Sequence, residues 1–177
     1  EINAAEDSEL GKAIAETKAF LSAEPSPPKL SPSKDIETQE LSHDDKEDLR
    51  VEADELLEQG NLEEAESFYD EALEYYQQAF AVYQRIGELK GLVEVLQKMA
   101  VVFRDQGKYK EALEHFEDAL QIAESQGFNS MKAHLYLDLG TVFTFKANYK
   151  KASEVLQRGL EINTVLNDRF LKAKILG

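Results

Sequence analysis

Hydrophobic positions in the second half of the chain recur at helical spacing, and the whole set then repeats 40 residues later. The i, i+3, i+4, i+7 order is typical of one face of an amphipathic helix. A break at 105–108 contains Gly107, and glycine readily ends a helix. One stripe before the break consists of Leu96, Met99, Ala100 and Phe103, and one after it of Ala112, Phe116, Ala119 and Leu120. The pattern predicts two antiparallel helices per unit.

The same unit occurs about three times. Tyr109 pairs with Tyr149, and Ala112 with Ala152, each 40 residues apart. Forty residues before the stripe that begins at Ala112 come Ala72, Tyr76, Ala79 and Phe80. One helix pair cannot bury its apolar face alone, so successive pairs must stack. We therefore expect an all-α solenoid of stacked antiparallel helix pairs.

The expected helices span 43–59, 62–86, 89–106, 109–126, 130–146 and 149–166, with a last one starting near Asp168. Ser42 is the predicted N-cap of the first helix, with Asp45 three residues on. Gly60 lies seven residues before the position at which the period expects a turn. We interpret it as an early turn, which gives the helix at 62–86 two extra helical turns.

The chain divides into three expected parts. Residues 1–24 form an amphipathic helical segment, 25–42 a flexible Pro/Ser linker, and 43–177 the repeat domain with about three helix pairs plus a truncated helix. The chain opens at Glu1 and not at Met, and position 177 lies in the middle of a predicted helix. We expect the native protein to continue.

The motif Gly-x-Tyr-x-x-Ala-x-x-x-Phe/Leu-x-x-Ala/Gly-Leu, at 107–120 and, with Ala147 in place of the glycine, at 147–160, resembles the tetratricopeptide repeat. The 40-residue period, longer than the usual ~34 residues, is similar to the long repeats of LGN/Pins adaptors and kinesin light chain. This resemblance implies a right-handed solenoid that binds proteins.

The resemblance also implies a binding groove lined by the first helix of each pair, which suits an extended or helical peptide. The Lys and Asn of a carboxylate clamp are missing, because Gln97, Leu137, Val101 and Thr141 occupy those positions. The expected groove residues are Arg50, Asp54, Glu94, Gln97, Lys98, Asp105, His134, Leu137, Asp138, Thr141 and Phe145.

The formal net charge of −15 lies almost wholly in the first half of the chain. Residues 51–80 hold ten acids and no base, whereas 81–177 hold 12 acids and 14 bases. This charge would repel a phosphate backbone, which argues against nucleic acid, and it favours a basic protein or peptide partner. The alternative is a solvated acidic surface that only aids solubility.

Two further surfaces are candidates for contacts. Phe68 and Tyr75 form an aromatic stripe beside the core stripe of the predicted helix 62–86; it either fills the core or receives another helix, from residues 4–22 or from a partner. The turns between paired helices carry Lys108, Lys110, Lys146, Lys150 and Lys151, whereas the first repeat carries Glu63 and Glu64 there. Head-to-tail association of these opposite charges is one hypothesis, and the oligomeric state stays open.

The sequence contains no catalytic motif, so we expect no enzymatic activity, cofactor or metal. His43, His115 and His134 are scattered, and the last two are predicted to lie on helix surfaces. The lack of cysteine fits the cytoplasm or another reducing compartment, and no run is apolar enough to span a membrane. The expected function is a protein-interaction scaffold, adaptor or assembly factor. The alternatives are a peptide-responsive regulatory sensor controlling an effector domain beyond Gly177, and a repeat module of a larger enzyme.

Overall fold

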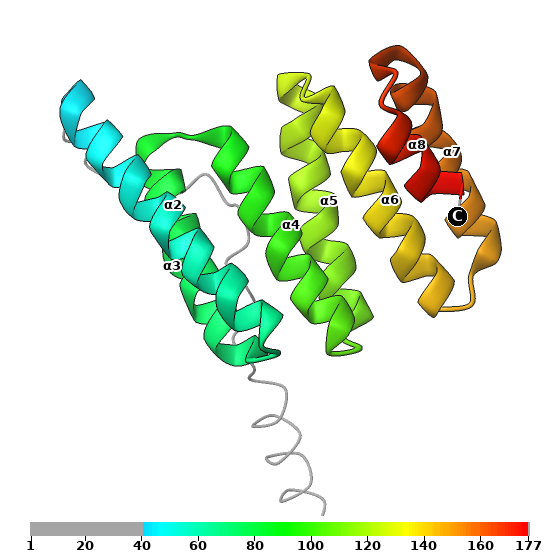
Figure 1. Cartoon of the computed structure of the whole chain (residues 1–177), viewed down its shortest axis with the longest axis horizontal. Helices are drawn as coiled ribbons and strands as arrows, with labels where there is room; N and C mark the ends of the chain where they lie inside the picture. The colour runs from blue at the N-terminus through cyan, green and yellow to red at the C-terminus, as the bar shows by residue number, and fades with distance from the viewer. Residues whose placement is uncertain (1–40, 177) are drawn as a thin grey trace, which may run out of the picture. The chain divides into compact units, whose positions relative to one another are not determined.

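A computed structural model describes residues 41–176, which form seven α-helices: three consecutive antiparallel pairs and a single last helix (Figure 1). The predicted segment 1–24 and almost all of the predicted linker 25–42 lie outside the described residues. The helices are α2 (His43–Ala65), α3 (Tyr69–Ile86), α4 (Leu89–Asp105), α5 (Tyr109–Gln126), α6 (Asn129–Phe145), α7 (Tyr149–Leu166) and α8 (Arg169–Leu176). The predicted all-α solenoid is confirmed.

The first helix, α2, begins at a capping box. The Asp45 amide donates to the Ser42 hydroxyl oxygen at 3.1 Å, and the Ser42 amide donates to the Asp45 carboxylate at 3.1 Å. Two amides that the helix itself leaves without partners are thus satisfied. The predicted N-cap is confirmed.

The turns repeat as regularly as the helices. Between the helices of a pair, Ser67, Gly107 and Ala147 adopt a left-handed backbone with φ of 65°, 75° and 54°. Between successive pairs, Gly87, Gly127 and Asn167 do so with φ of 75°, 70° and 56°. Within each set the residues are 40 positions apart, so the same turn conformation recurs in every repeat, whether or not the residue is glycine.

The predicted boundary between the first two helices is wrong. Gly60 is not in a turn but is buried inside α2, which continues to Ala65. It occupies the place that Ala100 and Gly140 occupy in the later pairs, where a small residue lets the paired helices approach. A Cβ on Gly60 would collide with the ring of Tyr76. The extra residues of the first repeat therefore belong to the N-terminal end of α2, and α3 has the ordinary length.

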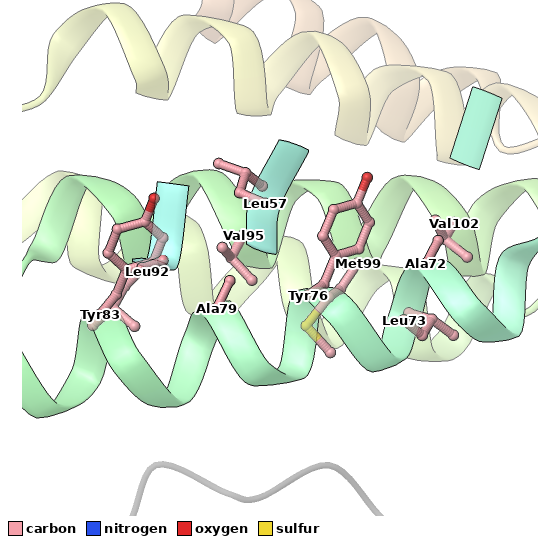
Figure 2. Packing of buried hydrophobic residues seen from close by; sticks show 11 residues of the cluster. Leu57, Ala72, Leu73, Tyr76, Ala79, Tyr83, Leu92, Val95, Met99 and Val102 are labelled. Carbon is pink, nitrogen blue, oxygen red and sulfur yellow. The ribbon is translucent and has the colours of Figure 1, made fainter. Parts of the chain in front are cut away.

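The core of the first two repeats lies between α2, α3 and α4 (Figure 2). Tyr76 and Tyr83 of α3 are buried together with Leu57 of α2 and with Val95 and Met99 of α4. A helix that contributes side chains to both neighbours ties one repeat to the next, which is the physical basis of solenoid stability.

The first helices of successive pairs contact one another: α2 touches α4, α4 touches α6, and α6 touches α8. Within residues 41–176, no such contact joins the second helices α3, α5 and α7 to one another. Because the first helices are closer together, the stack curves toward them. We call the inner side, formed by α2, α4, α6 and α8, the first-helix face.

Candidate partner-binding surface

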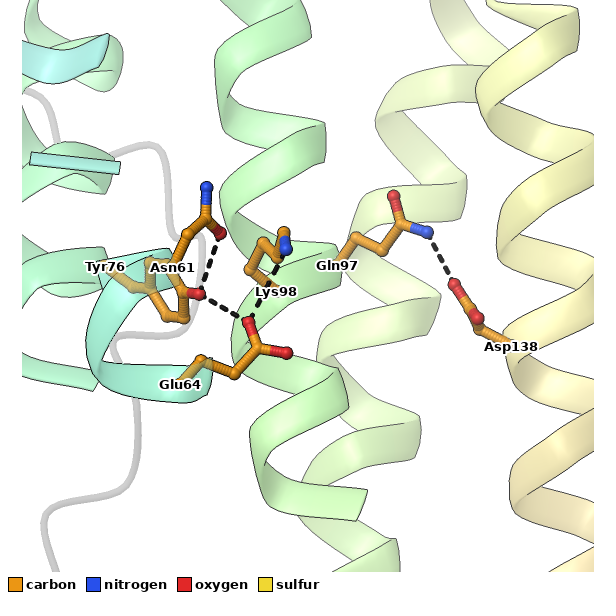
Figure 3. Close-up of polar contacts among 6 residues, drawn as sticks. All are labelled: Asn61, Glu64, Tyr76, Gln97, Lys98 and Asp138. Carbon is orange, nitrogen blue, oxygen red and sulfur yellow. Dashed lines mark hydrogen bonds and ion pairs between the residues drawn. The ribbon is translucent and has the colours of Figure 1, made fainter. Parts of the chain in front are cut away.

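The central contact of the first-helix face joins two repeats. The Gln97 side-chain amide on α4 donates a hydrogen bond to Asp138 Oδ2 on α6 at 2.5 Å (Figure 3). Both side chains are half-buried. Sequence reasoning placed both residues on this face, and the structure brings them into contact.

Asp138 is a carboxylate of this face whose pKa is shifted by its surroundings. Burial raises its pKa, and the Gln97 hydrogen bond together with the charges of Arg104, His134 and Lys174 partly opposes the rise. Desolvation disfavours the ionised form, whereas hydrogen bonds and nearby cations favour it. Within residues 41–176, Asp138 Oδ1 accepts no hydrogen bond. That oxygen remains available to a donor from outside.

A second polar cluster closes the end of α2 against its neighbours. The Tyr76 hydroxyl donates to Glu64 Oε2 at 2.6 Å and lies 3.1 Å from the side-chain oxygen of Asn61. Lys98 Nζ on α4 lies 3.5 Å from the same Glu64 oxygen (Figure 3). Burial and the Glu64 contact raise the pKa of Tyr76 far above its ordinary value, so the hydroxyl stays protonated.

A family model described as tetratricopeptide repeat matches residues 52–125 and again residues 91–164. Together these ranges cover most of the chain. The chain belongs to the tetratricopeptide repeat family. Such repeats are protein–protein interaction modules, so the coarse function is the binding of proteins or peptides. The family is in general a non-enzymatic scaffold.

Three solved structures are similar to this chain in fold, and two of them, STI-1 and Sgt2, are tetratricopeptide repeat domains. BtubC (BKLC) from P. vanneervenii matches with TM-score 0.58 and 18% identity, over 63% of this chain and 46% of that one. The N-terminal domain of stress-induced protein-1 (STI-1) from C. elegans matches with TM-score 0.56 and 16% identity, over 72% and 94%. The Sgt2 TPR domain from Aspergillus fumigatus matches with TM-score 0.54 and 22% identity, over 70% and 74%.

The chain thus spans about half of the BtubC chain that it matches. A search of curated proteins finds no match. At these identities the structural likeness establishes the fold only. The nature of the partner must be inferred from the residues of this chain.

The predicted tetratricopeptide register of the first helix is wrong by seven residues, because it was counted from Gly60 as a turn. The 40-residue relation places Asn61 and Glu64 on the first-helix face, level with Val101 and Arg104. Arg50 lies outside that register, near the start of α2, and pairs with Glu47 at 2.9 Å. Sequence reasoning therefore did not place Asn61 or Glu64 on this face, although it named Glu64 as a turn residue; counting back 40 residues from Val101 would have found Asn61.

The other predicted groove residues differ in their exposure and in the side-chain contacts that they form. Asp54 accepts a hydrogen bond from the Tyr83 hydroxyl at 2.5 Å, and Asp105 pairs with Arg104 at 2.7 Å. These contacts hold both carboxylates within their own repeats. Glu94 is exposed, whereas His134, Leu137 and Thr141 are half-buried. Arg104 is a further residue that sequence reasoning missed.

The predicted aromatic residues do not form one helix stripe. Phe68 lies in the turn before α3 and is 50% exposed, whereas Tyr75 is half-buried on α3 itself. Phe145 at the end of α6 is 59% exposed and stacks against Tyr109 with centroids 6.2 Å apart. Docking of residues 4–22 falls outside the described residues and stays a prediction.

His115 is not a surface residue, contrary to the sequence prediction. It is 3% exposed on α5 and stacks on Phe103, with centroids 5.2 Å apart and an interplanar angle of 6°. Neither ring nitrogen has a hydrogen-bond partner among the described residues. Across residues 41–176 the structure contains no group of three or more side chains placed to hold a metal ion and no helix able to cross a membrane.

Proposed function

We propose that this chain is a protein-interaction scaffold or adaptor whose first-helix face binds an extended or helical peptide through a basic side chain of that peptide. The observation that carries the proposal is Asp138. Its carboxylate is half-buried between two repeats and held by Gln97 through one oxygen only. A lysine or arginine of a partner would meet the second oxygen and stabilise the charge that burial disfavours.

The surroundings of Asp138 suit a peptide. Leu137 and Val101 are half-buried on the same face, and Phe145 offers an exposed ring. A few apolar positions beside one charged anchor are the usual composition of a peptide site, in which a small number of contacts provide most of the affinity.

The first repeat supports a basic partner. Helix α2 carries ten acids and two bases. A hollow of about 420 Å³ on α2 is lined by Glu52, Glu55, Leu56, Glu58 and Gln59. Within residues 41–176, none of its three glutamates forms an ion pair. A basic segment that extends from the Asp138 anchor toward α2 would meet increasing negative potential.

The experiment is selection from a random peptide library with the whole chain, followed by affinity measurement on the enriched peptides. We expect enrichment of lysine and arginine, and a loss of about 10–100-fold in affinity in Asp138→Asn. Asp118→Asn is the matched control. Asp118 is also a half-buried aspartate whose pKa is raised by burial, but it lies on α5, the second helix of its pair, and so outside the first-helix face.

Two outcomes would contradict the proposal. One is enrichment of acidic or wholly apolar peptides. The other is equal affinity in Asp138→Asn and wild type, because the anchor would then contribute nothing.

A further inference from the structure

One edge of the solenoid is strongly polarised in charge. We call it the turn edge and define it as 63–71, 103–111 and 143–151, the three segments centred on the turns between paired helices. The three turns follow one another along the lower edge in Figure 1. Segment 63–71 has five acids and no base, 103–111 has three bases and two acids, and 143–151 has three bases and no acid.

The opposite edge shows that this arrangement is not general. Its turns lie in 83–91, 123–131 and 163–171. Segment 83–91 holds two bases and one acid, and segment 123–131 holds one acid and no base. Segment 163–171 holds one base and one acid. The change from acidic to basic therefore belongs to the turn edge and does not follow simply from the overall gradient along the chain.

Each charged end of the turn edge also exposes aromatic rings. Phe68 is 50% exposed at the acidic end, and Phe145 and Tyr149 are 59% and 68% exposed at the basic end. Large exposed aromatic side chains are enriched at protein interfaces and depleted from ordinary surface. The charges and the rings thus mark the same two places.

The lysines at the basic end are available. Within residues 41–176, neither Lys146 nor Lys150 forms an ion pair or lies over a ring. Lys151 lies 5.5 Å from the centroid of Phe143. At the acidic end, Glu63 and Glu66 likewise form no ion pair with a described residue.

A partner that complements the whole turn edge must be basic opposite the first repeat and acidic opposite the third. A uniformly anionic surface, such as a lipid bilayer, would attract the third repeat but meet five acids at the first. A second copy of the same edge, turned by 180°, has the required order of charges at the required spacing. Its acidic first repeat would face the basic third repeat, and the reverse, with the nearly neutral second repeats at the centre.

We propose that two copies of this chain pair antiparallel through their turn edges, about a two-fold axis near the second repeat. Phe68 of one copy then meets Phe145 and Tyr149 of the other, twice per dimer. The arrangement is isologous and closes at two subunits. It differs from the head-to-tail association hypothesised from the sequence, because an antiparallel pair brings each acidic end against a basic end and closes at two subunits. Asp138 itself lies outside the three segments of this edge, whereas Phe145 belongs both to this edge and to the surroundings of the peptide site.

The test uses two charge-reversed variants of the full chain. Variant one carries Lys146→Glu and Lys150→Glu, which makes both ends of the edge acidic. Variant two carries Glu63→Lys, Glu66→Lys and Glu71→Lys, which leaves two acids and three bases in segment 63–71 and so makes both ends basic. The first two sites lie at the C-terminal end of α2, where lysine suits the helix dipole. The control, Arg85→Glu with Lys172→Glu, makes the same charge change as variant one near the opposite edge.

Sedimentation equilibrium at about 0.1 M salt, where charges are screened beyond about 10 Å, limits long-range repulsion between the two chains of net charge −15. We expect wild type and control to dimerise. Each variant alone should show a dissociation constant at least about tenfold higher. An equimolar mixture of the two variants should recover the dimer, because each then meets the opposite charge. Circular dichroism checks that both variants fold.

The proposal is overturned if wild type is monomeric throughout, if either variant dimerises alone as well as wild type, or if the mixture fails to associate. A monomeric wild type that cosediments with phosphatidylserine vesicles would also overturn it and assign the basic end to an anionic surface. None of these results depends on Asp138, so this failure is separate from that of the peptide site.

Discussion

Gly60 of α2 lies against the ring of Tyr76 of α3, with no space between them for a Cβ atom. Glycine inside a helix usually costs about 0.5–1 kcal/mol relative to alanine. Here we expect the opposite sign. The Tyr76 ring is fully buried and its hydroxyl is held by Glu64, so it cannot move aside freely. Gly60→Ala should lower the free energy of unfolding by about 1–3 kcal/mol, measured by urea denaturation.

Tyr76→Leu provides the control for this collision. In that background the ring is gone, and adding Gly60→Ala should cost little or should stabilise α2. Equal costs in both backgrounds would mean that the packing against Tyr76 is not the cause.

The same glycine shows where sequence reasoning failed. A glycine followed by Asn61 has the composition of a turn, and local chemistry alone cannot distinguish a turn from a close helix contact. The 40-residue period contained the answer, because it aligns Gly60 with Ala100 and Gly140. Helix bounds from α4 onward were predicted to within about one residue because their turns do contain the expected signals.

A second prediction concerns the turn within the third pair. Ala147 has φ of 54° at the position where the second pair has Gly107 with φ of 75°. A left-handed backbone costs a residue with a Cβ about 1 kcal/mol, a cost that glycine avoids. Ala147→Gly should raise the melting temperature and Gly107→Ala should lower it. Each shift should correspond to a change of about 1 kcal/mol in the free energy of unfolding.

Because both residues belong to equivalent turns, each variant controls for the other. A Cβ on Gly107 has open space around it, so only backbone strain is tested there. Two shifts of the same sign in thermal melts would contradict the explanation.

The third prediction is a dependence of stability on pH through His115. Burial lowers its pKa, although Asp118 and Glu114 act in the opposite direction. In the unfolded chain His115 binds a proton near pH 6.5, whereas in the folded chain it stays neutral to lower pH. Stability is therefore full above pH 6.5 and falls as the pH decreases toward the folded pKa, by at most about 1.4 kcal/mol per pH unit.

His115→Phe should remove this part of the pH dependence, since phenylalanine can stack on Phe103 without titrating. The measurement is the difference in unfolding free energy between wild type and variant at several pH values from 7 to 5. A difference that does not change with pH would contradict the role of His115. Its burial was not predictable from the helical period alone, because the equivalent residues Tyr75 and Val155 are only half-buried.

The candidate site was predictable in part: the repeat register shows which residues share a face but not which of them touch. The tetratricopeptide register placed Gln97 and Asp138 on one face, since equivalent positions of a solenoid line up. It could not show that the amide reaches the carboxylate of the next repeat, because that depends on how closely α4 approaches α6. Nor did it identify Arg104, whose equivalents Glu64 and Thr144 share no chemistry with it.

The last prediction tests the contact between Gln97 and Asp138. The hydrogen bond from Gln97 lowers the pKa of Asp138 against the effect of burial. Gln97→Leu removes the donor, so the pKa of Asp138 should rise further, as measured by NMR titration of its carboxyl carbon. A folded-state pKa above the unfolded value favours folding at low pH and loses that benefit as the pH rises. The variant should therefore lose about 1–3 kcal/mol at pH 7 and less at pH 4. Asparagine at this position cannot ionise, so in the Asp138→Asn background Gln97→Leu should lower the free energy of unfolding by the same amount at pH 7 and at pH 4. An unchanged or lower pKa for Asp138 in Gln97→Leu would mean that another group holds this carboxylate.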